Sequence, residues 1–267
     1  MKTKRFLVLM TLVACAAGTT FGQGMFGGGR PRSKDLGAQM AKFFGKNTAF
    51  SAKAQITMTS SSGNSMPAME FQYDVLDGKV RTEMDMTKMR GGNLPPEAVA
   101  QMKQMGMDRT IHIFLPEKKV SYLIYPSMQA YCEMDANQMT DQKQGKDYKL
   151  QETELGKDTI DGHPCLKSKI VATDEEGHKS EALVWKATDL KGFPIQWQTT
   201  SEDGSTMTMK FTDINQSKPS SSLFEPPSDY KRYASMQELM MSNMQRMMPS
   251  GAMPPHGAGT PPRSGDE

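Results

Sequence analysis

The chain has 267 residues, of which 23% are charged, 37% hydrophobic and 7% aromatic, a composition typical of a soluble protein with one large domain or two small ones. Outside one short apolar run near the start, no stretch approaches the ~20 apolar residues of a membrane-spanning helix, which excludes a multi-pass membrane protein. The formal charge is +2, and without the basic residues at positions 2, 4 and 5 there are 29 basic against 30 acidic residues. Because nucleic-acid binding rests on a basic surplus, we expect no nucleic-acid partner.

The first 22 residues have the order of a secretory signal peptide. Residues 1–5 form a short basic segment, residues 6–17 are apolar or small, and further small residues precede the expected cleavage site after Gly22. We therefore expect export to the periplasm or outer membrane of a bacterium. Cleavage after Gly22 would release a free protein, which the small residues before the cut favour. Residues 12–15 also resemble a lipobox, in which Cys15 would be acylated and would associate the chain with a membrane.

Removal of the signal leaves two cysteines, Cys132 and Cys165. In an oxidising compartment they could form a disulfide, worth about 3 to 4 kcal/mol for a loop of this size. Two buried free thiols are the alternative. Neither cysteine has the close Cys or His spacing of a zinc site, so we expect no metal site and no cofactor.

The segments on either side of the central region differ from it in composition. Residues 23–32 are Gly-rich and predict a flexible lead. The β domain is expected at 33–233 and opens with a short helix at 33–44, capped by Ser33. A Met-rich amphipathic helix is predicted at 234–249, followed by a disordered Pro/Gly tail at 250–267.

Within this domain the apolar residues alternate with polar ones from Ala49 to Asn215. The residues from Met69 to Val75 and from Val80 to Met86 form two such runs around an Asp77-Gly78 turn, which predicts a hairpin. The same pattern predicts strands at 111–115, 120–125, 129–134, 149–155, 166–173, 179–186, 193–200 and 206–214. About ten or eleven strands with short turns predict a mainly β fold, a large curled antiparallel sheet. Pro95 and Pro96 open an inserted helix that could cover its mouth.

The apolar side of these strands is the candidate ligand-binding surface. The chain contains 25 methionines, and methionine is a flexible side chain that is common where varied apolar ligands bind. The apolar side chains of the strands either line such a pocket or fill the interior of the sheet as an ordinary core. Thirteen of these apolar side chains would face inward if the sheet curls: Ile56, Met58, Met69, Phe71, Tyr73, Met84, Met86, Phe193, Ile195, Trp197, Met207, Met209 and Phe211.

Methionine also suggests a second function, because thioether sulfur binds Cu(I) in exported proteins. The candidate groups are Met84, Met86 and Met89, or the cluster of Met236, Met240, Met241, Met244, Met247 and Met248. The second group, however, lies along one stripe of a helix that ends before Pro249. Packing against the sheet requires that stripe without any metal, and we favour it.

The sequence gives little support for catalysis. The four histidines, His112, His163, His178 and His256, are scattered along the chain. It contains no G-x-S-x-G elbow, no H-E-x-x-H helix and no phosphate-binding glycine loop. We therefore expect no enzyme.

Three segments, within roughly residues 35–233, resemble the outer-membrane lipoprotein carrier (LolA-like) superfamily, in an uncharacterised branch. They are an R-x-E element at Arg81 and Glu83, a strand ending in Tyr125-Pro126, and an F-x-x-P-x-x-Y exit at 224–230. The resemblance implies a half-open β-barrel whose concave apolar face, covered by helices, holds a lipid or acyl chain. We thus expect a monomeric, non-enzymatic envelope protein that binds a lipid or an acylated protein. Only Arg81 lies near a position that matches the family's gating arginine.

Overall fold

The computed structural model describes residues 44–66, 68–88, 95–135, 149–173, 177 and 179–247. The expected signal, Cys15, flexible lead, Pro/Gly tail and most of the first helix lie outside these residues. Twelve strands form one sheet. In chain order, the strands are β1 (Ala49–Thr59), β2 (Met69–Leu76), β3 (Lys79–Asp85), β4 (Arg109–Leu115), β5 (Val120–Tyr125), β6 (Ala130–Asp135), β7 (Lys149–Ile160), β8 (His163–Thr173), β9 (Lys179–Ala187), β10 (Phe193–Thr200), β11 (Thr206–Asn215) and β12 (Lys231–Tyr233).

The sheet is built from two meanders, one from β1 to β6 and one from β7 to β11. They join where β1 pairs with β11, and the order across the sheet is β12-β6-β5-β4-β3-β2-β1-β11-β10-β9-β8-β7. Every pairing is antiparallel except that of β12 with β6. The β2–β3 turn places Asp77 and Gly78 at φ 48° and 88°, which is the left-handed backbone of a tight hairpin turn and explains why the Asp-Gly signal was informative.

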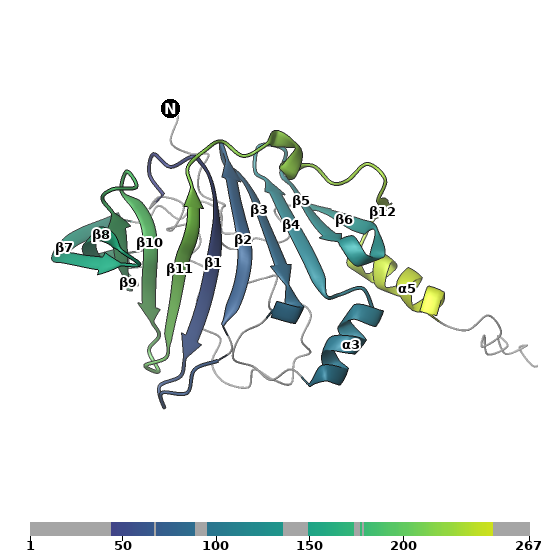
Figure 1. The fold of residues 1–267 in the computed structure, drawn as a ribbon, viewed down its shortest axis with the longest axis horizontal. Coiled ribbons are helices and arrows are strands. Elements are labelled where there is room, and N and C mark those ends of the chain that lie inside the picture. Colours follow the sequence, from purple (N-terminus) through teal and green to yellow (C-terminus); the bar gives the residue numbers. More distant parts are fainter. Residues whose placement is uncertain are drawn as a thin grey trace, which may run out of the picture.

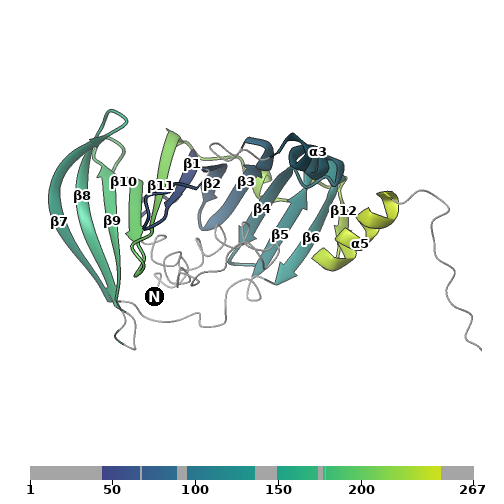
Figure 2. The same ribbon diagram turned by 90° about the horizontal axis from the view of Figure 1, so that it is seen from below.

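The twelve strands curl into an open trough rather than a closed barrel (Figures 1 and 2). The two edge strands are β7 and β12. Large antiparallel sheets curl because each strand carries a right-handed twist. This architecture confirms the predicted fold class, a half-open antiparallel β structure with covering helices.

The pairing register defines two faces of the sheet. Tyr73 lies opposite Ala52 and Thr82, so these side chains share one face. On that face, the rings of Phe50 (β1) and Phe193 (β10) are 4.9 Å apart between centroids, although β11 lies between their strands and strands two positions apart are ~10 Å apart in backbone. The side chains therefore converge, and we call this concave side the inner face and the other side the outer face.

Within the described residues, two α-helices accompany the sheet. The helix α5 (Met236–Met247) packs on β6 and β12 through buried Leu239, and Ser235 Oγ accepts the backbone N–H of Glu238 at 3.1 Å as an N-cap. The helix α3 (Pro96–Gln104) begins at a proline, as predicted, and buries none of its side chains. Ala98, Val99 and Met102 of this helix are half-buried, and Asn243 Nδ2 of α5 donates a hydrogen bond to the carbonyl of Met105 at its C-terminal end, at 2.8 Å.

The predicted disulfide is wrong, and the alternative of two free buried thiols holds. Cys132 lies in β6 and Cys165 in β8, with eight strands between them in the sheet. Cys132 packs under α5 beside Tyr233, whereas Cys165 packs beside Trp185. A disulfide requires Cα atoms within ~7 Å of one another, and this separation across the sheet excludes it.

Candidate ligand-binding face

The inner face carries twelve of the thirteen predicted lining residues in one apolar cluster. The register shows how they come together, since Met209 of β11 lies opposite both Ile56 of β1 and Trp197 of β10. Residues from five strands and the 3-10 turn η2 (Met86–Lys88) thus share one surface. The twelve are Ile56, Met58, Met69, Phe71, Tyr73, Met84, Met86, Phe193, Trp197, Met207, Met209 and Phe211.

Ile195 is the exception, and its assignment to the inner face is corrected. The β9–β10 register shifts between Pro194 and Gln196, which leaves Ile195 without a partner on β9. Ile195 packs instead with Trp185, which is next in sequence to the inner-face residue Val184 and therefore points to the outer face. A β-bulge breaks the alternation on which the prediction depended.

Aromatic rings form the centre of the inner face around Phe211. The ring centroids of Tyr73, Phe193 and Trp197 lie 5.7, 5.5 and 5.6 Å from that of Phe211. Phe44 and Phe50 join the same cluster, and the sequence analysis did not count them among the lining residues. The alternation from Phe50 through Ile56 was the signal that could have found the second of them.

Four methionines pack against this cluster at one end of the strands that carry it. Met58, Met69, Met86 and Met207 are only half-buried and pack against the buried rings. Met58 lies directly opposite Met207 across the β1–β11 pair. We call these four residues the methionine margin; they are the flexible, partly accessible part of the inner face.

Two polar atoms inside the cluster have no hydrogen-bond partner among the described residues: the hydroxyl of Tyr73 and the indole nitrogen of Trp197. Both side chains are buried, with exposed fractions of 0% and 2%. Burial raises the pKa of Tyr73 well above its ordinary value, so the hydroxyl keeps its proton. The inner face thus presents two protonated groups, each able to donate a hydrogen bond.

Farther along the same face, a second polar group is fully paired. His112 of β4 lies opposite Thr82 of β3 in the register, and its Nε2 shares a hydrogen bond with the hydroxyl of Ser121. Burial lowers the pKa of His112 to about 4, so the imidazole is neutral near pH 7. The scattered histidines of the sequence therefore include one interior histidine with a structural partner.

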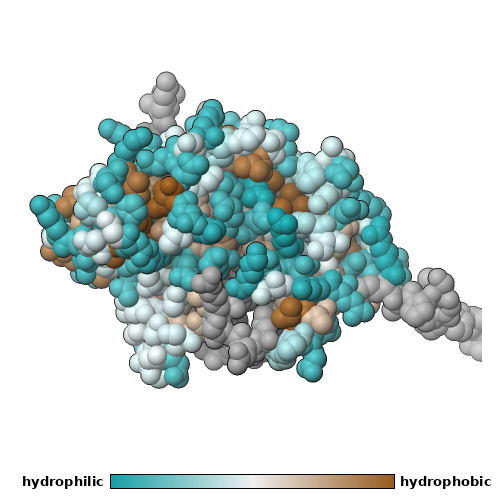
Figure 3. Space-filling view, in the orientation of Figure 1, coloured by the Kyte–Doolittle hydropathy of each residue, from teal (hydrophilic) through white to brown (hydrophobic). Residues whose placement is uncertain are grey.

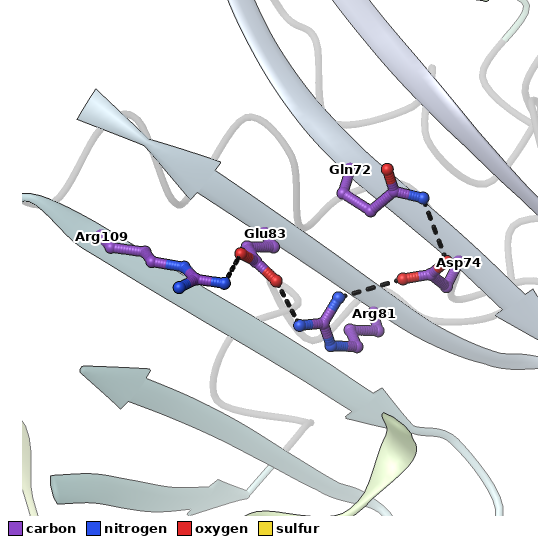
Figure 4. Close-up of polar contacts among 5 residues, drawn as sticks. All are labelled: Gln72, Asp74, Arg81, Glu83 and Arg109. Atoms are coloured by element: carbon purple, nitrogen blue, oxygen red, sulfur yellow. Dashed lines mark hydrogen bonds and ion pairs between the residues drawn. The ribbon is translucent and has the colours of Figure 1, made fainter. Parts of the chain in front are cut away.

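The outer face carries a chain of charges across β2, β3 and β4 (Figure 4). Arg81 donates to Asp74 at 3.0 Å and to Glu83, and Glu83 also accepts from Arg109. Burial alone would raise the pKa of Glu83, but the hydrogen bonds and charges of the two arginines outweigh it and lower the pKa. The R-x-E element that carried the family resemblance thus joins strands on the side away from the apolar cluster.

The chain after β11 covers part of the outer face, over β3 and β4. It runs along one end of the strands through the 3-10 turn η4 (Ser221–Phe224), as Figure 1 shows. Phe224 is buried there against Leu76 and Ile113. In the space-filling view hydrophilic side chains occupy the middle of this face and hydrophobic ones gather over β8–β10 (Figure 3). The turn η4 thus covers the apolar side chains of the outer face near β3 and β4. The inner face, which holds the predicted lining residues, is the candidate site.

The methionine helix divides into packed and exposed positions. Met236 and Met240 pack on the cluster beneath α5, as the packing interpretation predicted, whereas Met241 and Met244 are 55% and 58% exposed. A cavity of about 440 Å³ lies between α5 and β12, lined by Lys231, Tyr233, Met241 and others. Among the described residues no cluster of three or more His, Cys, Asp or Glu could hold a metal ion. Within those same residues, no helix is long and apolar enough to span a membrane.

Comparisons with known proteins give similarity in structure alone. No family model matches the sequence, and no curated protein matches it. Several solved structures match, at low sequence identity. A LolA superfamily protein from Nitrosomonas europaea is 8% identical over 69% of this chain and 93% of its own, with a TM-score of 0.33.

Two mycobacterial lipoproteins give similar values. For LppX from Mycobacterium tuberculosis the identity is 9%, the coverage 63% of this chain and 88% of that one, and the TM-score 0.36. For LprF from Mycobacterium bovis the identity is 12%, the coverage 76% of this chain and 100% of that one, and the TM-score 0.37. These TM-scores are low, so the evidence for a function comes from the two faces of the sheet and not from the similar structures.

Proposed function

We propose that this chain is a non-enzymatic protein of the cell envelope that holds a lipid-like amphiphile on the inner face of its half-open sheet. The observation that carries the proposal is the methionine margin, in which four half-buried methionines pack against one end of a cluster of buried rings. Flexible thioether side chains can repack around an inserted acyl chain without a fixed complementary shape. A polar headgroup would remain toward water.

The concave geometry supports the same proposal. Ligand sites of this kind are concave and mostly apolar, with a small number of polar groups. The outer face differs, because its buried charges are paired with one another and η4 covers its apolar side chains near β3 and β4. A bound chain on the inner face would contact residues of both meanders, which explains why the two are joined at β1–β11.

The test is lipid capture by the purified domain from residue 23 onward. We expect mass spectrometry of the folded protein, after incubation with a total lipid extract, to detect a bound amphiphile. Met69→Glu places a charge in the methionine margin and should abolish capture, whereas Met241→Glu on exposed α5 should leave it intact. Failure of the wild-type protein to capture any amphiphile would refute the proposal.

A structural barrel with a filled interior is the second candidate, and one observation favours it. The rings around Phe211 are already in mutual contact, at centroid distances of 5.5 to 6.4 Å. On this alternative Met69→Glu lowers stability and the wild-type protein captures nothing. Binding and unfolding measurements on the same variants therefore separate the two functions.

The cellular place of the protein is part of the proposal. Residues 1–22 have the order of an export signal, and Cys15 lies in a lipobox-like sequence. Labelling cells with a radioactive fatty acid, in parallel for the wild type and Cys15→Ala, distinguishes a lipoprotein from a free periplasmic protein. We propose the free, monomeric form, in which label is absent from both chains.

A further inference from the structure

Two buried donors on the inner face point to the chemical class of the ligand. We propose that the bound amphiphile is a neutral acyl ester or amide whose carbonyl oxygen accepts hydrogen bonds from the Tyr73 hydroxyl and the Trp197 indole. This inference rests on the proposed function, because it requires a ligand on the inner face. It adds that the ligand is more than an alkyl chain.

The absence of partners at these two atoms is unusual for a protein interior. At least about nine in ten buried polar groups in folded proteins have a hydrogen-bond partner, because an unpaired one costs free energy. The same inner face contains an internal comparison, since His112 and Ser121 are equally buried and bond to each other. Tyr73 and Trp197 have no such partner among the described residues.

Both donors belong to the same apolar cluster. Tyr73 comes from β2 and Trp197 from β10, and both rings pack on Phe211, at 5.7 and 5.6 Å between centroids. An indole N–H only donates hydrogen bonds, and a phenol hydroxyl donates readily. A carbonyl oxygen has two lone pairs and can accept from both, whereas a hydrocarbon or an alkyl ether offers less or nothing.

The surroundings favour a neutral ligand group over a carboxylate. Among the described residues the buried charged side chains are those of Asp74 and Arg81, and both belong to the chain of charges on the outer face. A charge buried without a countercharge costs far more than a neutral carbonyl with two donors. A free fatty acid would therefore bind with its carboxylate elsewhere, and an ester or amide is the better fit.

The experiment compares two lipids that differ only in the carbonyl. A 1-acylglycerol and a 1-O-alkylglycerol of equal chain length displace N-phenyl-1-naphthylamine from the wild-type protein and from Tyr73→Phe. We expect the wild type to bind the ester about 30-fold more tightly than the ether, since each of the two hydrogen bonds contributes about 1 kcal/mol. Tyr73→Phe should weaken ester binding about fivefold and leave ether binding unchanged. Tyr233→Phe, outside the inner-face cluster, is the matched control and should change neither.

Each other outcome has a defined meaning. If neither lipid displaces the probe from the wild type, the proposed function itself fails. If both lipids bind equally well, or Tyr73→Phe weakens both alike, the amphiphile site stands and the carbonyl assignment is overturned. Tighter binding of a free fatty acid of the same chain length than of the ester would also overturn the assignment to neutral lipids.

Discussion

Replacement of Tyr73 by Phe should stabilise the ligand-free protein, which is the reverse of the usual effect. The substitution removes one oxygen from a side chain that is 0% exposed and keeps the ring that packs on Phe211. The hydroxyl has no partner among the described residues, so its burial costs about 1 to 3 kcal/mol with no compensating bond. We expect the free energy of unfolding to rise by about 1 kcal/mol and Tm by about 2 to 4 °C.

Urea unfolding followed by circular dichroism measures this effect, with Tyr233→Phe as the matched control. Tyr233 is 4% exposed, but its hydroxyl bonds to Ser242 Oγ at 2.8 Å, so loss of the hydroxyl should destabilise the protein by about 1 kcal/mol. The two isosteric changes should therefore have opposite signs. If Tyr73→Phe is as destabilising as Tyr233→Phe, the Tyr73 hydroxyl has a partner in the folded protein and the reasoning fails.

Three further predictions concern charge, pH and thiols. Arg81→Met should destabilise the protein by about 3 kcal/mol in urea unfolding, because it leaves the carboxylate of Asp74, whose side chain is 4% exposed, without its cation; an effect below 1 kcal/mol would contradict this. The buried, neutral His112 has a folded pKa of about 4 against an ordinary 6.5, so the unfolded state binds the proton first, and stability should fall by about 1.4 kcal/mol per pH unit from pH 6.5 down to about 4. His112→Gln should remove that slope, measured as unfolding free energy against pH. In the domain from residue 23 onward, both buried thiols, Cys132 and Cys165, should react with a thiol reagent only after unfolding. If the cysteines of the unfolded chain do not react with the reagent, they are joined in a disulfide and this prediction is wrong.

The strands could be predicted closely because their signals are local. Alternation of apolar and polar residues has a period of two in any strand, whatever its neighbours. The predicted strand at 120–125 and the observed β5 (Val120–Tyr125) coincide, and the hairpin around Asp77-Gly78 has the expected turn. The curl of the sheet could also be expected from the number of strands and their twist.

The order of the strands could not be predicted in this way. The pairing of β1 with β11 joins segments about 150 residues apart, and it depends on how the two meanders dock. The mistaken disulfide has the same cause, since the spacing of Cys132 and Cys165 in the chain contains no information about the eight strands between them. Ile195 was assigned to the wrong face because the register of β10 shifts beside it. Its neighbour Pro194 was a local signal for this shift, since proline is often found at bulges.

The contrast between the two faces explains where a ligand can bind. On the outer face Arg81 bonds to Asp74 and Glu83, and the segment around Phe224 covers the neighbouring apolar side chains; both kinds of surface are satisfied by the chain itself. The inner face has the opposite arrangement, with half-buried methionines at its margin and unpaired donors within. A polar group without a partner is costly only while it stays unpaired, so any molecule that supplies an acceptor there gains the free energy that the empty protein forgoes. The Tyr73 hydroxyl thus lowers the stability of the ligand-free protein and raises its affinity for the ligand. This is why Tyr73→Phe should stabilise the fold and weaken ligand binding.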